Sequence, residues 1–179
     1  MLINPFYVGL MGASVLVLGY AWPAKKIKNP RKSFKNWLFV LGALFMLVSS
    51  YFNYLLGGAI FYIFLQLLAN LASLFLMLRI NKKASIVFII LASIAFIGAS
   101  LFYFEDFSTV LFIIGLSLIA VGYILDSGTV KRNVMLCLGS MFIAIFSYIE
   151  GNMIFLYLNI LCSIFTIFHI YKLSLKKKC

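Results

Sequence analysis

The chain has 179 residues, of which 65% are hydrophobic and only 11% are charged, and its formal net charge is +11. A soluble domain keeps roughly a quarter of its residues charged, because water must wet its surface. The mean hydropathy of +1.13 therefore excludes an ordinary soluble domain. We predict an all-α polytopic membrane protein, since the apolar residues fall into blocks close to the roughly 20 residues that a helix needs to cross a bilayer.

Seven such blocks follow one another along the chain. Each must form a helix, because hydrocarbon offers no water to hydrogen-bond the backbone. No positively charged segment precedes the first block and no small-residue cleavage pattern accompanies it, so we expect this block to be retained as a span. The predicted spans are Tyr7–Pro23, Asn36–Asn53, Leu55–Leu78, Ala84–Phe104, Ser108–Leu125, Asn133–Ile149 and Met153–Leu173.

The charged residues separate by side if these seven spans alternate in direction. All 15 Lys and Arg residues then lie on one side, whereas Glu105, Asp106 and Glu150 lie on the other side. Positively charged connections stay in the cytoplasm. The pattern predicts an N-terminus outside and a C-terminus inside, and an even number of spans would break the separation.

The most basic segment, Lys25–Lys35, follows the first span and carries six cations. We interpret it as an anchor that fixes the orientation of the chain in the membrane. A second interpretation is that it binds anionic lipid headgroups, at about 1 kcal/mol per cation near the surface. We expect no nucleic-acid partner, because no soluble fold remains to present these cations to a groove.

Three short segments of the first half recur in the same order in the second half. The small residues of the first pair of segments are expected to let helices approach closely, namely Gly12, Ser14, Gly19, Gly115, Ser117 and Gly122. The matching pairs are GASVLVLGY (Gly12–Tyr20) with GLSLIAVGY (Gly115–Tyr123), NWLFVLGALF (from Asn36) with NVMLCLGSMF (from Asn133), and GGAIF (Gly57–Phe61) with GNMIF (Gly151–Phe155).

This recurrence predicts two copies of a three-helix unit. The first would occupy residues 1–83 and the second residues 108–179, with a linker helix at residues 84–107. An odd number of spans separates corresponding helices, so the two units would point the same way in a 3+1+3 parallel repeat. Such repeats are typical of secondary transporters, whose solute site lies near mid-membrane where the repeats meet.

Two motifs carry a resemblance to a known family: WPAKKIKNPRKSFKN (Trp22–Asn36) and LLANLASLFLML (Leu67–Leu78). Together with the layout, they resemble the SWEET and semiSWEET sugar transporters and the wider PQ-loop superfamily. The nicotinamide riboside transporter family has the same three-one-three layout and is a second candidate relative. The resemblance implies that Asn70 and its counterpart Asn159 flank the solute. The chain departs from the family at Ala24, where the Pro-Gln pair would place Gln.

Uncharged polar side chains within the spans are the candidate solute-binding residues. An amide offers donors and acceptors without carrying charge, which suits a neutral polar solute. The alternative is that these groups bond a neighbouring helix. For Asn70 both interpretations stay open, and the alternative fits Gln66 better because Gln66 has no counterpart in the second half. The candidates are Asn70, Asn159, Gln66, Ser73, Ser163, Tyr51 and Tyr148.

The acids lie at connections or helix ends, and the one histidine, His169, lies close to the cytoplasmic end of the last span. Proton-coupled transport normally uses an intramembrane acid or histidine, so this pattern favours facilitated diffusion. We find no catalytic constellation and expect no enzyme activity, cofactor or metal site.

The sequence thus predicts a membrane carrier for a small neutral polar solute, such as a sugar, nucleoside or vitamin-like compound. The alternative is a non-transporting membrane protein that serves in assembly, immunity or lipid interaction. The bias toward Lys, Ile and Phe is typical of an AT-rich bacterial genome, so we expect the inner (plasma) membrane. The sequence leaves a homo-oligomer open.

Overall fold

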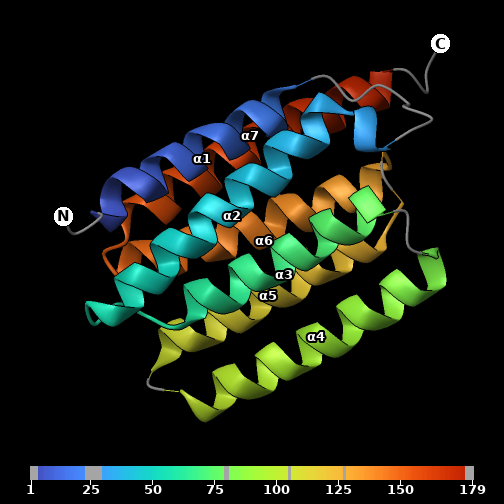
Figure 1. Cartoon of the computed structure of the whole chain (residues 1–179). Coiled ribbons are helices and arrows are strands. Elements are labelled where there is room, and N and C mark those ends of the chain that lie inside the picture. Colours follow the sequence, from blue (N-terminus) through green and yellow to red (C-terminus); the bar gives the residue numbers. More distant parts are fainter. Residues whose placement is uncertain (1–3, 23–29, 79–80, 105, 127, 176–179) are drawn as a thin grey trace. The chain divides into compact units, whose positions relative to one another are not determined.

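The computed structural model describes residues 4–22, 30–78, 81–104, 106–126 and 128–175. Every regular element in these ranges is helical (Figure 1), which confirms the all-α prediction. The elements are α1 (Pro5–Ala21), the short 3-10 helix η1 (Pro30–Lys32), α2 (Phe34–Leu55), α3 (Phe61–Leu78), α4 (Lys82–Phe102), α5 (Phe107–Ile124), α6 (Val130–Ile149) and α7 (Met153–Leu175).

Six of the helices, α2 to α7, are long and apolar enough to cross a membrane. Helix α1 is also apolar but has 17 residues, at the lower end of the length that a span requires. Large apolar side chains stand exposed on the helices, as Leu91 and Ile94 of α4 do, with exposed fractions of 58% and 62%. Exposed apolar faces of this kind suit lipid rather than water. The fold is therefore compatible with an integral membrane protein.

The third helix begins later than the sequence predicts. The predicted span started at Leu55, whereas α3 starts at Phe61. The reason is Gly57, whose φ of +91° lies in the left-handed region and ends α2. The N–H of Gly58 donates to the Asn53 carbonyl at 2.9 Å, which closes the turn as a Schellman motif. The prediction was wrong because it placed this glycine pair inside a helix.

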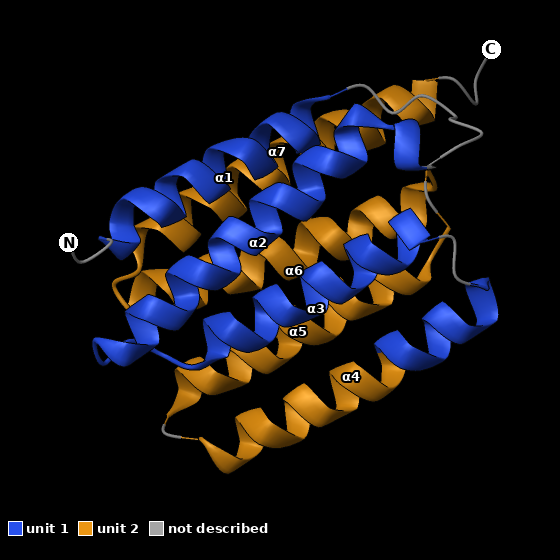
Figure 2. Cartoon of the chain, viewed as in Figure 1, with its two compact units in different colours: residues 1–89 blue, residues 90–179 orange. Residues whose placement is uncertain are grey.

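The chain divides into two compact units, residues 1–89 and residues 90–179, with the boundary inside α4 (Figure 2). In the first unit, α2 packs against both α1 and α3. In the second unit, α6 packs against both α5 and α7. In each trio, α1–α3 and α5–α7, the middle helix therefore packs against both of the others.

In the first unit, α1 and α2 cross at glycines, which have no side chain to keep the two backbones apart. A Cβ atom on Gly12 would lie 2.9 Å from the backbone nitrogen of Met46, and a Cβ on Gly42 would lie 2.9 Å from that of Leu16. Ser49 near the end of α2 donates to the carbonyl of Pro5 at the start of α1, at 2.7 Å. The two helices are thus antiparallel, and their backbones touch.

In the second unit, α5 and α6 cross in the same manner. A Cβ atom on Gly139 would lie 2.9 Å from the carbonyl oxygen of Gly115 and 3.0 Å from the backbone nitrogen of Ile119. A Cβ on Gly115 would lie 2.8 Å from the side chain of Ile143. Each of these helices therefore requires a glycine at the crossing.

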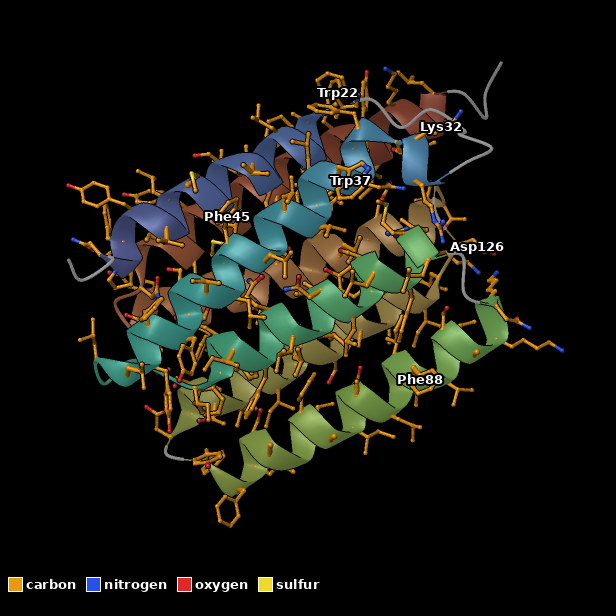
Figure 3. All side chains as sticks on the ribbon, in the orientation of Figure 1. Trp22, Lys32, Trp37, Phe45, Phe88 and Asp126 are labelled. Atoms are coloured by element: carbon orange, nitrogen blue, oxygen red, sulfur yellow. The ribbon has the colours of Figure 1, made fainter. Side chains whose placement is uncertain are left out.

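Two cations of the basic segment bind helix ends in the first unit. The Lys35 ammonium donates to the carbonyl of Trp22 after α1 at 3.0 Å, and the Arg31 guanidinium donates to the carbonyl of Met77 in the last turn of α3 at 3.3 Å. The last carbonyls of a helix lack intrahelical donors and carry partial negative charge, so cations stabilise them. Figure 3 shows Trp22 at this end of the unit. The other cations of the predicted anchor are Lys32, which is exposed in η1, and Lys25, Lys26 and Lys28, which lie outside the described part of the chain.

Two acids gather at one end of the second unit. The carboxylate of Asp106 caps α5 by accepting from the backbone N–H of Ser108 at 2.8 Å, and the Ser108 hydroxyl donates to Glu150 at the end of α6, also at 2.8 Å. Hydrogen bonding by Ser108 and by the backbone amide of Thr109 lowers the pKa of Asp106, so this carboxyl stays ionised at its helix N-terminus. Glu105, the third acid predicted for this side, lies outside the described residues.

The glycine crossing generates a stability prediction. Replacing Gly139→Ala forces a Cβ against the backbone of α5, and we expect a destabilisation of about 1–3 kcal/mol because neither backbone can move freely. The measurement is the midpoint of thermal unfolding in detergent or nanodiscs.

Gly98→Ala in α4 is the matched control, because a Cβ there would meet no other described atom within 4 Å. This control should unfold at the wild-type temperature or slightly above it, since Ala favours the helix. Equal losses in both variants would contradict the close crossing.

Candidate functional site

The candidate site in the first unit is a stripe of polar side chains on α3. Tyr62, Gln66, Asn70 and Ser73 recur at helical spacing, as the sequence predicts, and so share one face. Gln66 and Asn70 are exposed by only 3% and 5%, whereas Ser73 is half-buried. Amides this deeply buried in an apolar chain require hydrogen-bond partners.

The amide nitrogen of Asn70 is fully engaged. It donates to the carbonyl of Ala43 on α2 at 3.0 Å and to the carbonyl of Gln66 on its own helix at 2.8 Å. A backbone carbonyl can only accept, so these two bonds fix which end of the amide is the nitrogen. Asn70 therefore joins α3 to α2, which is the interhelical role that the sequence left open.

The side-chain oxygens of the same two residues are not engaged. Gln66 Oε1 and Asn70 Oδ1 are buried and accept no hydrogen bond from any described group. An unpaired buried acceptor costs about 1–3 kcal/mol, and such an atom in a folded protein calls for a specific explanation. A molecule that brings N–H or O–H donors to this stripe would remove the cost.

The corresponding stripe in the second unit lies on α7. Asn159 is buried and its amide nitrogen donates to the carbonyl of Phe155 on its own helix at 2.8 Å. The Ser163 hydroxyl donates to the carbonyl of Asn159 on its own helix at 2.9 Å and lies 3.4 Å from the carbonyl of Cys137 on α6. The Cys137 thiol donates to the Ser163 carbonyl at 3.9 Å, so Ser163 and Cys137 are where this stripe meets α6. Asn159 and Ser163 thus occupy one buried face, with Thr166 one turn further.

The remaining candidates lie elsewhere. Tyr51 and Tyr148 are exposed by 52% and 67%, so the structure does not bring them to the buried stripes. Ser73 donates to the carbonyl of Ala69 on its own helix at 2.8 Å. A solute contact for these three side chains stays a prediction.

One buried polar residue was missed by the sequence reasoning. Thr109 in the first turn of α5 is fully buried, and its hydroxyl oxygen has no hydrogen-bond partner among the described residues. A single threonine at the start of an apolar helix gives no signal, because threonine is favoured at helix starts for hydrogen bonding to the local backbone.

No protein-family model matches this sequence, and comparisons with curated proteins and with solved structures find no significant match. Within the described ranges, no group of three or more His, Cys, Asp or Glu side chains is placed to hold a metal ion. The class of protein that the fold defines is an all-helical chain suited to a membrane, with two buried polar stripes.

The bond between Asn70 and Ala43 generates a second prediction. Asn70→Leu removes the hydrogen bond from this stripe to the Ala43 carbonyl of α2, and we expect a loss of stability of about 0.6–2 kcal/mol, the usual size of an interhelical bond in a membrane.

The control is Ser73→Ala, which removes a hydroxyl bonded only to its own helix. Thermal unfolding of both variants in nanodiscs gives the comparison. A larger loss for Ser73→Ala than for Asn70→Leu would contradict the assigned role of Asn70.

Proposed function

We propose that this protein is a membrane carrier for a small neutral polar solute, working by alternating access of two three-helix units and by facilitated diffusion. The observation that carries the proposal is the pair of buried, unpaired acceptor oxygens on Gln66 and Asn70. A purely structural amide would have both of its ends satisfied. A buried acceptor without a hydrogen-bond donor, in an otherwise apolar chain, suits a ligand that binds reversibly.

A duplicated unit is supported by the glycine crossings. Gly12 faces Met46 as Gly115 faces Ile143, and these residues correspond in the two halves of the sequence. Gly42 and Gly139 likewise face corresponding residues, Leu16 and Ile119. Two units with the same internal packing are what a transporter built from repeats requires.

The turn between the second and third helices of each unit also corresponds. Gly151 has a φ of +68°, and the N–H of Asn152 donates to the carbonyl of Ser147 at 2.9 Å. This is the bond pattern of the turn at Gly57 and Gly58. The match supports the resemblance to the SWEET and PQ-loop transporters in layout, and the nicotinamide riboside transporters remain the second candidate.

Facilitated diffusion is supported by where the titratable groups lie. The described acids, Asp106, Asp126 and Glu150, lie at helix ends, and His169 lies in the last two turns of α7. A proton relay would place such a group at mid-span. The proposed carrier therefore moves its solute down its own gradient.

The alternative function, a non-transporting membrane protein, is favoured by one observation. The Asn70 amide nitrogen already serves as a bond between α3 and α2. If a donor from a protein partner or a lipid meets the open oxygens, the same stripe is an assembly surface rather than a solute site.

The carrier is tested by solute uptake into liposomes that contain the full chain, with a panel of sugars, nucleosides and vitamins. We expect saturable uptake of at least one class by the wild type and loss of that uptake in Asn70→Leu combined with Asn159→Leu. Folding of the variant is checked by its unfolding transition.

Ser117→Ala is the control for the uptake assay, because this hydroxyl is bonded only to the Ile113 carbonyl of its own helix. Its uptake should equal that of the wild type. Absence of uptake across the whole panel would reject the carrier and favour the non-transporting alternative.

The proposed orientation is tested by labelling single cysteines in intact cells with a membrane-impermeant reagent. With the native cysteines replaced, a cysteine at Asn152 should be labelled from outside, and a cysteine at Lys82 should be labelled only after lysis. Labelling of both positions from outside would contradict an outside N-terminus.

A further inference from the structure

The cations of the first unit have no acidic partner within that unit. Residues 1–89 carry nine Lys and Arg residues and no Asp or Glu. Cations gathered at a membrane surface attract anionic lipid headgroups. We infer that η1 and the start of α2 form a binding site for one anionic phospholipid, whose phosphate is bonded by Arg31 and Lys32 and whose acyl chains lie along α2. This inference goes beyond the proposed carrier function and does not depend on it.

The guanidinium of Arg31 is held in place through one of its three nitrogens. Its Nε donates to the carbonyl of Met77 at 3.3 Å, and the backbone carbonyl of Arg31 accepts from the indole N–H of Trp37 at 2.9 Å. Among the described residues, neither Nη group has a hydrogen-bond or ion-pair partner. A planar guanidinium whose Nη donors are available suits bidentate bonding of a phosphate. Because the Nε bond already orients the side chain, less conformational entropy is lost when a phosphate binds.

Lys32 supplies a second cation next to Arg31. It is the last residue of η1, its side chain is exposed, and its ammonium bonds no described residue. Lys35 differs, because its ammonium donates to the carbonyl of Trp22 at 3.0 Å and lies 5.7 Å from the centre of the Phe39 ring. Arg31 and Lys32 are therefore the described cations of this segment whose donors are available to a phosphate.

Aromatic side chains place this site at the depth of lipid headgroups. Trp22 and Trp37 are exposed by 46% and 48%, and Figure 3 shows both at the same end of the first unit as Lys32. The exposed ring of Phe34 lies against Trp22, with ring centroids 5.0 Å apart. Tryptophan gathers at the membrane–water interface because its ring is amphipathic. The phosphate at this depth of a bilayer is that of a lipid.

An exposed apolar stripe of α2 leads from this site along the helix. Its members, Trp37, Leu41, Leu44 and Val48, recur at intervals of three or four residues and are exposed by 42–48%. Val48 follows Trp37 by eleven residues, which is a rise of about 16 Å along a helix. The hydrocarbon core of a bilayer is about 30 Å thick, so the stripe is as long as one leaflet is deep. It therefore suits the acyl chains of a lipid whose headgroup lies at η1.

The charge of the site selects among lipids. A phosphocholine headgroup brings its own cation, which Arg31 and Lys32 repel and which no acid of residues 1–89 can pair. A phosphoglycerol headgroup carries the phosphate without a cation. The expected ligand is therefore an anionic glycerophospholipid such as phosphatidylglycerol, rather than phosphatidylcholine.

The two Trp residues of the chain both border the proposed site, so tryptophan fluorescence reports its occupancy. The full chain is reconstituted in phosphatidylcholine vesicles with increasing fractions of phosphatidylglycerol whose acyl chains carry bromine, which quenches indole on contact. Brominated phosphatidylcholine is the reference lipid. We expect a preference of about 25-fold for the anionic lipid, at about fivefold for each of the two cations.

Lys32→Gln removes a side chain that bonds no described residue, so the fold should be kept and the preference should fall about fivefold. Lys83→Gln is the matched control, because Lys83 is also an exposed lysine of residues 1–89 but lies on α4. Its preference should change by less than about twofold, since salt screens distant surface charges. Equal losses in the two variants would show attraction by surface charge alone and overturn the site.

Arg31→Lys keeps the charge but removes the planar pair of Nη donors, so the preference should fall although the net charge is unchanged. Its fold is checked by the unfolding transition in phosphatidylcholine alone. An unchanged preference in Arg31→Lys, or equal quenching of the wild type by both brominated lipids, would overturn the inference.

Inorganic phosphate in excess separates a lipid from a free anion. It should not restore the fluorescence quenched by brominated phosphatidylglycerol, because it lacks the acyl chains that α2 contacts. Full restoration would overturn the assignment to a lipid. Solute uptake has no bearing on any of these outcomes, so this inference and the carrier function fail separately.

Discussion

Helices surrounded by hydrocarbon gain no hydrophobic free energy from meeting each other, so this structure depends on how closely their backbones can approach. In each unit the first two helices of the trio come closest at two glycines, one on each helix, each of which faces the other helix. On α5 and α6 the carbonyl oxygen of Gly115 occupies the space beside Gly139 that any larger residue would need. These crossings fix the middle helix of each trio, and the middle helix in turn fixes the helix that carries the polar stripe.

The two ends of the Asn70 amide are used differently. Its nitrogen joins α3 to the Ala43 carbonyl of α2, and the orientation that this bond imposes leaves its oxygen open beside that of Gln66. The packing role of Asn70 and the solute contact that we propose for it are compatible, because they use different atoms of the amide. The unpaired oxygens are a stability cost of the kind that functional sites commonly carry.

Charged side chains lie at the ends of the helices, with cations at the carbonyl ends and an acid at an amide end, as the helix dipole favours. Arg31 and Lys35 meet the carbonyl ends of α3 and α1, while Asp106 meets the amide end of α5. The basic segment therefore has a structural role in the first unit besides the orientation of the chain that we propose for it. Glu150 joins the acidic end through Ser108, so the ends of α5 and α6 are tied by a charge-assisted hydrogen bond.

The sequence by itself determined the helices, because apolar blocks of this length have to satisfy their backbone groups internally. It also placed Gln66 and Asn70 on one face and marked Gly12 and Gly115 as positions of close packing, since helical spacing and residue size are local properties. Only the tertiary structure decided which oxygen atoms stay unpaired, since the partner of Asn70 is a carbonyl on another helix. It also decided that Tyr51 and Tyr148 stand exposed and that a left-handed Gly57 delays the start of α3, because burial depends on neighbouring helices and a chain reversal depends on how two helices pack.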